Sequence, residues 1–432
     1  MAKGKTFHNN DTETETETEW SDHPGAKDKP APKTSSKQKK TTTFSPDTQD
    51  TPVQKKSSFW PRLFWGNVML FGFFTIIRAG HFYAACLVIF LNTMMFKEVL
   101  SIKRHMEKDR QLPFFYLINW HFFTLALFAL YGKGLAERCT HYFPKAQFFE
   151  FIYRYHYVIA FLGYVLGVVV FVMSLRKRQY RYQFRQFGWT HLALFLIVLP
   201  SSAEVAIIYQ GIMWFLYICF LIITNDSWAY FFGILFGRTP LISLSPKKTW
   251  EGFIGGMICT YILAFVLIDH LAQYDYLFCP QPSLGIELFA DLTCERPAYL
   301  FAMHEFATPQ FLVSLGLSAT FTMSTLQMHS FVLATFASII APFGGFFASG
   351  LKRAFKVKDF GDIIPGHGGV TDRMDCQMLM GMFCYVWLFQ VVYRGASMVI
   401  ASPEFILEQI ALMSQGDQML VLEELQKRLM GQ

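Results

Sequence analysis

The chain has 432 residues, of which 53% are hydrophobic and only 16% charged, and its net charge is +6. This apolar share is above that of ordinary soluble domains and predicts an all-α polytopic membrane protein. The basic residues are clustered and form no nucleic-acid-binding motif, so we expect no nucleic-acid partner. We interpret them as residues that orient the protein in the membrane and bind an anionic ligand. The eight cysteines include no CxxC pair, which argues against a zinc or redox module.

Residues 1–58 are expected to form a disordered N-terminal tail. They are rich in Lys, Thr, Ser, Asp, Glu and Pro, and they include a Thr-Glu repeat at 12–19. Such a segment buries too little apolar surface to offset the entropy of ordering the chain. No short apolar core with a cleavage site follows Met1, so we expect the first apolar span to act as the insertion signal.

Nine later segments are apolar and long enough to cross about 30 Å of hydrocarbon, which takes roughly 20 helical residues. They predict a transmembrane domain over 59–400. The segments lie near 60–78, 81–97, 113–132, 155–174, 187–206, 208–232, 252–271, 328–350 and 376–398.

The charges between these spans predict their orientation, because Lys and Arg accumulate in short cytoplasmic loops. With the N-terminal tail inside, the inner segments 97–110 and 176–185 carry five basic residues each. Continued alternation places 238–250 and 352–375 on the same inner face. The two most polar segments of the domain therefore meet the cytosol together.

The longest outer loop is predicted at 273–325. Its Cys279 and Cys294 either pair in an oxidising lumen or stay as two free thiols, and we favour the free thiols. The stretch 309–323 is apolar enough to lie in the membrane interface or to re-enter the bilayer. Residues 401–432 are predicted to form an amphipathic helical tail. That tail would lie on the membrane, against the partner subunit of a homodimer, or against the protein's own core.

Asp226 marks the first polar site, near the inner end of the sixth span. An ionisable residue beside a span is energetically costly, so we interpret it as functional and facing the interior of the bundle. The alternative is a simple carboxylate at a helix end. Gly233 and Gly237 belong to the same site or provide close helix contacts.

The second polar site covers 243–252. Lys247 and Lys248, beside hydroxyls such as Ser245, offer charge and hydrogen-bond donors to phosphate oxygens, and Trp250 can anchor at the interface or stack on a base. A basic membrane anchor would explain the lysines. It would not explain Glu251, which adds nothing to orientation.

The third polar site, 349–375, mixes acids and cations with five glycines. Mg²⁺ prefers one or two carboxylates together with substrate phosphates and water. Asp372 and Asp375 are spaced i, i+3 and would share a helix face if the ninth span has already begun there. Asp359 and Asp362 have the same spacing and form a second pair of carboxylates, or they stabilise the turn and balance the nearby positive charge.

A glycine-rich turn precedes the Asp372–Asp375 pair. The backbone amides of Gly366 to Gly369 can form an anion-binding nest. His367 is a phosphate donor, a proton handler or a hydrogen-bonded turn residue, since histidine changes charge near physiological pH.

This third site resembles the signature of the CDP-diacylglycerol synthases, or phosphatidate cytidylyltransferases. Asn225-Asp226 and the run from Ser245 to Gly252 are similar to the family too, so the likeness covers about 60–398. The long outer loop and polar tail resemble the eukaryotic branch, which implies the endoplasmic reticulum membrane with the site facing the cytosol. The signature is met at Ser349, Lys352-Arg353, Lys358-Asp359, Gly361, His367-Gly368-Gly369 and Asp372-Arg373-Met374-Asp375.

The resemblance implies a Mg²⁺-dependent transfer of CMP from CTP to phosphatidate, which yields CDP-diacylglycerol and diphosphate in phospholipid biosynthesis. The attacking phosphate monoester has its second ionisation near pH 6, so it needs no strong base. Catalysis would rest on positioning and charge neutralisation, with the acyl chains remaining in the bilayer and entering between spans.

Three groups of residues follow from this interpretation. Catalytic roles are assigned to Asp372, Asp375, Lys358, Asp359 and His367. Metal ligation is assigned to Asp372, Asp375, Asp226 and Asp359. Substrate binding is assigned to Lys247, Lys248, Ser245, Trp250, Glu251, Ser349, Lys352, Arg353, Gly368, Gly369 and Arg373.

Two other functions share part of this pattern. A transporter for an anionic solute also places Asp, Lys and broken helices within a bundle. However, no repeat of broken segments in two halves is visible, and the polar motifs lie at the ends of spans. A head-group transferase of the CDP-alcohol class predicts an Asp-Gly-x-x-Ala-Arg run, which the sequence does not contain.

Overall fold

The computed structural model describes residues 59–102, 114–143, 145–314, 316, 318–364, 368–393, 407, 410 and 414–430. Within these ranges eight helices are long and apolar enough to cross a membrane, and a further helix has a shorter apolar stretch, Phe64–Ala79. The chain is therefore an all-α polytopic membrane protein, as its composition predicts. The first helices are α1 (Phe59–Ala79), α2 (His81–Ile102), α4 (Phe115–Tyr142), α5 (Gln147–Met173) and α6 (Tyr180–Gln210).

The second half of the domain contains shorter elements between its spans. One continuous span, Thr325–Ala354, is assembled from α12 (Thr325–Thr335), the π-helical segment η1 (Phe336–Ile340) and α13 (Pro342–Ala354). The helix α17 (Gln415–Met430) lies in the predicted C-terminal tail. The other helices are α7 (Ile212–Phe236), α8 (Trp250–Ala272), α9 (Asp275–Phe278), α10 (Ala298–Phe301), α11 (Gln310–Val313), α14 (Thr371–Trp387) and η2 (Leu388–Val392).

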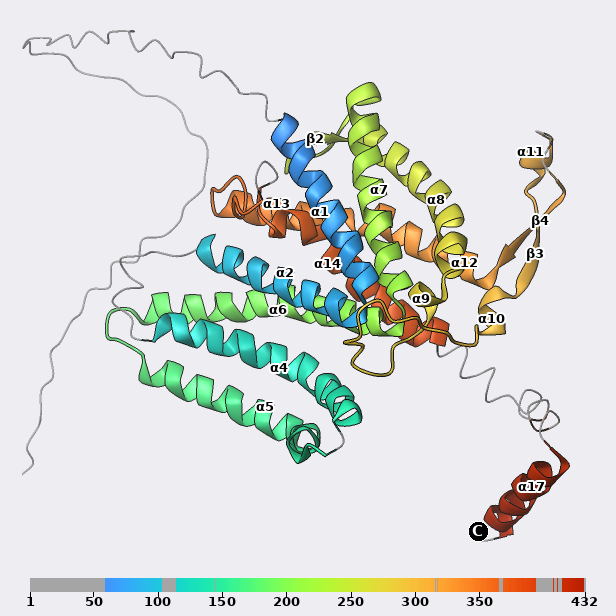
Figure 1. Ribbon diagram of the computed structural model, residues 1–432. Helices are drawn as coiled ribbons and strands as arrows, with labels where there is room; N and C mark the ends of the chain where they lie inside the picture. Colours follow the sequence, from blue (N-terminus) through green and yellow to red (C-terminus); the bar gives the residue numbers. More distant parts are fainter. Residues whose placement is uncertain are drawn as a thin grey trace, which may run out of the picture. The chain divides into compact units, whose positions relative to one another are not determined.

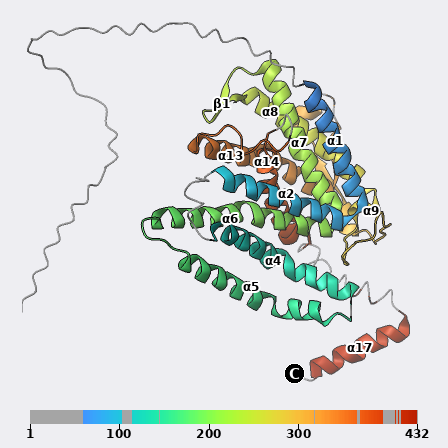
Figure 2. The same ribbon diagram turned by 60° about the vertical axis from the view of Figure 1, so that its left-hand side comes forward.

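Each of the nine predicted spans overlaps a helix, but several helices are longer than predicted. Helix α4 runs ten residues past the predicted end at 132, and Figures 1 and 2 both show it beside α5. In this extension Lys133 lies 5.2 Å from the ring centre of Tyr157, and Arg138 lies 4.0 Å from that of Tyr209. Cation–π contacts with aromatic side chains on neighbouring helices thus stabilise polar helical turns that hydropathy alone does not detect.

The first half of α7 forms the centre of the apolar core. Trp214 and Tyr217 are fully buried there, together with residues of α1, α8, α12 and α14. Beyond Ile222 the helix becomes largely exposed, and Asp226 lies in this second half. The predicted polar site therefore begins where α7 leaves the core.

Helices α7 and α8 pack closely because α8 presents glycines to α7. A Cβ atom added to Gly252 would lie 2.5 Å from the backbone oxygen of Ala229, and one on Gly256 would lie 2.9 Å from that of Asn225. Side chains at these positions would push the helices apart. Gly237 is equally confined, since its Cβ would collide with the backbone oxygen of Gly233. A close helix contact, the second interpretation of the two glycines, is present at Gly233, whose Cα would lie 3.1 Å from a Cβ atom on Gly252. Gly237 is confined by its own helix end and by Thr249 instead.

Two antiparallel hairpins join the spans. The first, β1 (Pro240–Ile242) with β2 (Ser245–Thr249), links α7 to α8. The second, β3 (Met303–Ala307) with β4 (Thr320–Ser324), pairs Glu305 with Thr322 in the segment between α8 and α12, the predicted outer loop. The apolar stretch 309–323, expected to lie in the interface or to re-enter, contributes α11 and most of β4.

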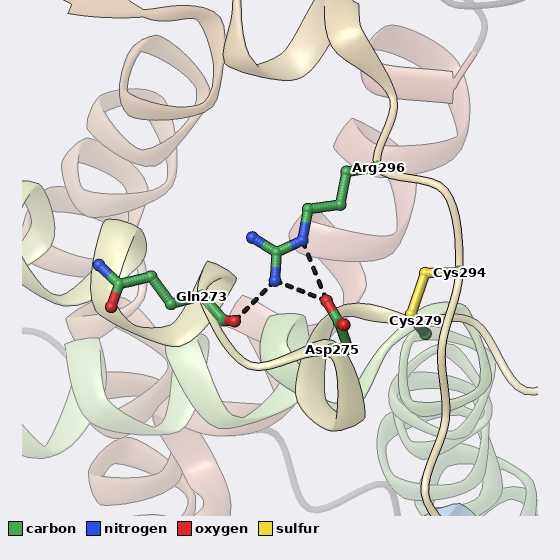
Figure 3. The surroundings of a disulfide bond; sticks show 5 residues. All are labelled: Gln273, Asp275, Cys279, Cys294 and Arg296. Carbon is green, nitrogen blue, oxygen red and sulfur yellow. Dashed lines mark hydrogen bonds and ion pairs between the residues drawn. A yellow bond between two sulfur atoms is a disulfide. The ribbon is translucent and has the colours of Figure 1, made fainter.

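The segment between α8 and α12 also contains a disulfide bond between Cys279 and Cys294, so the preferred interpretation as two free thiols is wrong. Figure 3 shows the bond beside Arg296, which binds the Asp275 carboxylate at 2.5 Å and donates to the Gln273 carbonyl at 2.6 Å. These contacts fold the loop back on the end of α8. Residue types and spacing did not reveal that the two cysteines meet.

Reduction of this disulfide should loosen the segment between α8 and α12. Closing a loop of 15 residues is worth about 3 kcal/mol in the chain-entropy account, so Cys294→Ser should lower the free energy of unfolding by roughly that amount. A maleimide mass-tag assay under denaturing conditions should detect two additional thiols after reduction of the wild-type protein. Cys259→Ser, which removes a free thiol of α8, is the matched control. Equal tagging before and after reduction would contradict the bond.

Candidate active site

The amino-terminal end of α14 is held by an acid from α2. One carboxyl oxygen of Glu98 accepts the backbone N–H of Val370 at 2.8 Å, and the other accepts both the N–H and the hydroxyl of Thr371 at 2.8 Å. The first N–H groups of a helix lack intrahelical acceptors, and an acid there also complements the helix dipole. Glu98 therefore connects α2 to the start of α14.

Sequence reasoning missed Glu98, although a usable signal was present. It is the only acid of α2, it directly follows Lys97 at the predicted end of the second span, and it is only 3% exposed. The rule that an ionisable residue beside a span is a functional candidate applies to Glu98 as it does to Asp226. Its partners 272 and 273 positions away could not be identified from the sequence.

Asp372 closes the loop between α13 and α14. Lys352 donates to one of its oxygens at 2.6 Å, while the backbone N–H of Phe360 donates to the other at 2.9 Å. Gly369 N–H adds a longer contact of 3.3 Å. The carboxylate and the ammonium are only 8% and 13% exposed, so this is a largely buried ion pair. In the structure Asp372 positions the loop, and its metal role stays a prediction.

Asp375 has different surroundings from Asp372. Three residues along an α-helix correspond to a rotation that leaves the two side chains about 60° apart. Asp375 lies within electrostatic range of Asp226 from α7 and of Lys248 from β2. Its Oδ1 accepts the N–H of Cys376 at 2.7 Å. The predicted pair thus shares a helix end but divides between two environments.

Glycines of α13 create the space beside Asp375. A Cβ atom on Gly344 would lie 2.5 Å from the Asp375 backbone oxygen, and one on Gly345 would lie 3.4 Å from its Oδ2. Larger residues at these positions would move α13 away from α14. Their role was not predicted, because small residues in an apolar span give no separate signal for function.

Asp226 completes a cluster drawn from all three predicted polar sites. It interacts electrostatically with Lys248 and with Arg373, the residue that follows Asp372 in α14. Lys248 Nζ lies 4.7 Å from the ring centre of Phe346 on α13. Two acids and two cations from three elements, α7, β2 and the start of α14, therefore lie within electrostatic range of one another.

Glu251 stabilises the hairpin that carries the lysines. Its carboxylate accepts the N–H groups of Arg238 and Thr239 at 3.1 and 3.2 Å and the hydroxyl of Thr239. Thr249 caps α8 by accepting the N–H of Gly252 at 3.2 Å. Trp250 follows with half of its surface exposed, in contact with Phe253.

The remaining predicted residues lie around this cluster. Ser349 and Arg353 belong to the last turns of α13, and Lys358 and Asp359 are exposed in the following loop. Gly368 has a φ of +84°, a conformation that favours glycine. Ser245 and Lys247 lie in β2. His367, with Pro365 and Gly366, falls outside the described residues.

The acids of the cluster suit a metal that the substrate helps to bind. Among the described residues no group of three or more His, Cys, Asp or Glu side chains could hold a metal alone. Asp226 and Asp375 provide two carboxylates, and Mg²⁺ in phosphate-transfer sites is commonly held by one or two carboxylates with substrate phosphates and water. This donor set fits Mg²⁺ bound together with a nucleotide.

Comparison with known proteins gives a consistent result. Residues 60–391 match the cytidylyltransferase family. Phosphatidate cytidylyltransferase 1 of Arabidopsis thaliana is 44% identical over 82% of this chain and 84% of its own length. The protein of that name from Rattus norvegicus is 39% identical over 84% of this chain and 77% of its own length. The phosphatidate cytidylyltransferase of Saccharomyces cerevisiae is 39% identical over 79% and 74%, respectively.

Proposed function

The chain belongs to the cytidylyltransferase family, and from that premise we propose how its residues act on CTP and phosphatidate. The protein is a nucleotidyltransferase that makes CDP-diacylglycerol and diphosphate. The observation that carries the assignment of the active site is the electrostatic proximity of Asp226, Lys248, Arg373 and Asp375, which come from three separate polar segments.

The chemical difficulty is repulsion between two highly negative groups. A phosphate oxygen of phosphatidate attacks the α-phosphorus of CTP, a new P–O bond forms, and the bond to the β-phosphate breaks as diphosphate leaves. The attacking phosphate is largely dianionic near neutral pH, so no strong general base is needed. Positioning and charge neutralisation then supply most of the rate enhancement.

The described residues divide these tasks. Lys248 and Arg373 neutralise the triphosphate and the lipid phosphate, while the Asp372–Lys352 pair and Glu98 fix the start of α14. Asp226 and Asp375 would hold Mg²⁺, which when bound supplies positive charge to phosphate oxygens. Lys247, Ser245 and Trp250 on the hairpin, Ser349 and Arg353 on α13, and the loop residues Lys358, Asp359, Gly368 and His367 are proposed as further substrate contacts.

We also propose the endoplasmic reticulum membrane as the location, with the site facing the cytosol. The disulfide supports this orientation, because disulfides persist in oxidising compartments such as the lumen. Helix α8 separates the Cys279–Cys294 loop from the hairpin with Lys248, and a single crossing puts them on opposite faces. A homodimer is a further proposal. The exposed Met419, Leu420 and Leu422 of α17 support contact with lipid or a second copy, which light scattering would distinguish.

The proposed reaction is tested with purified protein in nanodiscs and labelled CTP. Label should enter the lipid fraction only when phosphatidate and Mg²⁺ are both present. EDTA should abolish incorporation, and excess Mg²⁺ should restore it, because Lys248 and Arg373 alone supply too little positive charge for a triphosphate that lies beside two acids. Absence of turnover with every phosphatidate species would overturn the enzymatic assignment. Full turnover in EDTA would overturn the metal assignment alone.

A further inference from the structure

The β3–β4 hairpin, in the segment between α8 and α12, has an apolar face and a polar face. Residues that pair directly across two antiparallel strands point to the same side of the ribbon. Phe306 pairs with Phe321, and the centres of their stacked rings are 5.7 Å apart. Glu305 pairs with Thr322 on the opposite side. The other pairs are His304 with Met323 on the apolar face, and Met303 with Ser324 and Ala307 with Thr320 on the polar face.

The helical bundle leaves much of this hairpin exposed. The side chain of Phe321 is 42% exposed, and that of Phe311, in α11 between the two strands, is 66% exposed. Figure 1 shows the hairpin and α11 clear of the neighbouring helices and turned across the direction of the span α12–α13. A two-stranded hairpin alone is at best marginally stable in water. The apolar face therefore requires a covering surface from outside the bundle.

The base of the hairpin lies at a polar boundary between two spans. Ser324, the last residue of β4, caps α12 together with Gln327. The Gln327 amide also donates to the carboxylate of Asp269, in the last turn of α8, at 2.6 Å. His304 of β3 forms a hydrogen bond of 2.9 Å with the Thr325 hydroxyl. Because such polar groups are costly in hydrocarbon, they mark where α8 and α12 reach the membrane–water interface.

The charge of the hairpin matches a lipid surface. Within 303–324, Glu305 is the only Asp, Glu, Lys or Arg, and it lies on the polar face. Phenylalanine rings on the apolar face have no charged side chain beside them in the ribbon. Membrane binding by an apolar face scales with the apolar area that it buries, and without basic residues it gains nothing from anionic lipid. A zwitterionic bilayer is therefore sufficient to cover this face.

A second copy of the chain would be a poorer cover than lipid. Five residue pairs extend over about 17 Å at about 3.4 Å each, and two strands are about 10 Å wide. The apolar face thus offers roughly 170 Å², whereas a standard protein–protein interface buries about 800 Å² on each partner. A bilayer sets no such minimum, because the spans already hold the hairpin at its surface.

We propose that the β3–β4 hairpin lies on the membrane surface at the end of α8 far from Lys248, with Phe306 and Phe321 against lipid and Glu305 and Thr322 toward water. The proposal selects the membrane interface over re-entry, the two expectations for 309–323. It is independent of the proposed enzymatic function. Because β4 leads directly into α12, contact with lipid holds the start of the span that contains α13.

Photocrosslinking identifies what covers the apolar face. The full chain with p-benzoylphenylalanine in place of Phe321, in phosphatidylcholine liposomes, should gain the mass of one phosphatidylcholine on irradiation. The same probe in place of Thr322 is the matched control. It should form at most about a tenth as much adduct, because its side chain points to the other side of the ribbon. A crosslinked dimer from position 321 would overturn the proposal in favour of a second copy, and equal lipid adducts at both positions would overturn it in favour of re-entry.

Thiol accessibility tests the same orientation with a smaller change. In phosphatidylcholine nanodiscs, a membrane-impermeant maleimide should label Thr322→Cys about tenfold faster than Phe321→Cys, because the reactive thiolate forms in water and not in lipid. Both variants also carry Cys86→Ser, which removes an exposed native thiol, and an unchanged Tm shows that they are folded. Equally fast labelling would place the apolar face in water and overturn the proposal. Equally slow labelling would bury both faces and overturn it as well.

Discussion

Replacing Asp375 with Asn should abolish CDP-diacylglycerol formation while the protein remains folded. The side chain lies within electrostatic range of Asp226 and Lys248, and it accepts one short hydrogen bond from the backbone, at 2.7 Å. Asn preserves its size but removes a negative charge from the proposed metal site. Removing one charge-stabilising group from an active site typically lowers kcat by about 100-fold or more. The measurement is initial rate with labelled CTP, together with the thermal midpoint Tm.

Asp372→Asn should give a different result. It leaves the largely buried Lys352 ammonium without its charged partner, so we expect about 3 kcal/mol of destabilisation and a lower Tm. Asp291→Asn, in the exposed outer loop, is the control for both variants. Wild-type turnover in Asp375→Asn would refute its metal role. An inactive Asp372→Asn with unchanged Tm would instead assign Asp372 to the chemistry.

The contrast between Asp372 and Asp375 shows which features the sequence could predict and which it could not. The length of an apolar stretch predicts a span, because a crossing segment must match the thickness of the bilayer. It must also form all its backbone hydrogen bonds internally, which an α-helix does. Local spacing also placed Asp372 and Asp375 together at the start of a helix. It could not show that one binds Lys352 from the preceding helix while the other faces Asp226, because those partners depend on how three spans pack.

Other features were beyond prediction for a related reason. The Cys279–Cys294 bond depends on a loop folded by Arg296, and the hairpin between α7 and α8 depends on the contacts of Glu251 with Thr239. In each case the residues that make the contact are distant in sequence or belong to common residue types, so the sequence alone does not identify them.

Glu98→Gln should disturb the active site without touching substrate. Both oxygens of Glu98 accept hydrogen bonds from the start of α14, so an amide would point an NH₂ group at a backbone N–H or at the Thr371 amide and hydroxyl. Two buried donors that face each other cannot form a hydrogen bond, and this should lower the free energy of unfolding by on the order of 2 kcal/mol. We expect a lower Tm and a reduced kcat, because α14 carries Arg373 and Asp375.

A positioning role predicts more than loss of activity. Glu98→Asp should partly restore turnover, since a shorter carboxylate still offers two acceptors, whereas Glu98→Ala should not. The concentration of Mg²⁺ that gives half-maximal activity should rise in Glu98→Gln, because Asp375 is displaced with its helix. Glu137→Gln, an exposed acid on α4, should match the wild-type protein in both measurements. If Glu98→Gln kept the wild-type Mg²⁺ dependence and Tm but lost turnover, Glu98 would act on the substrate directly and the positioning role would fail.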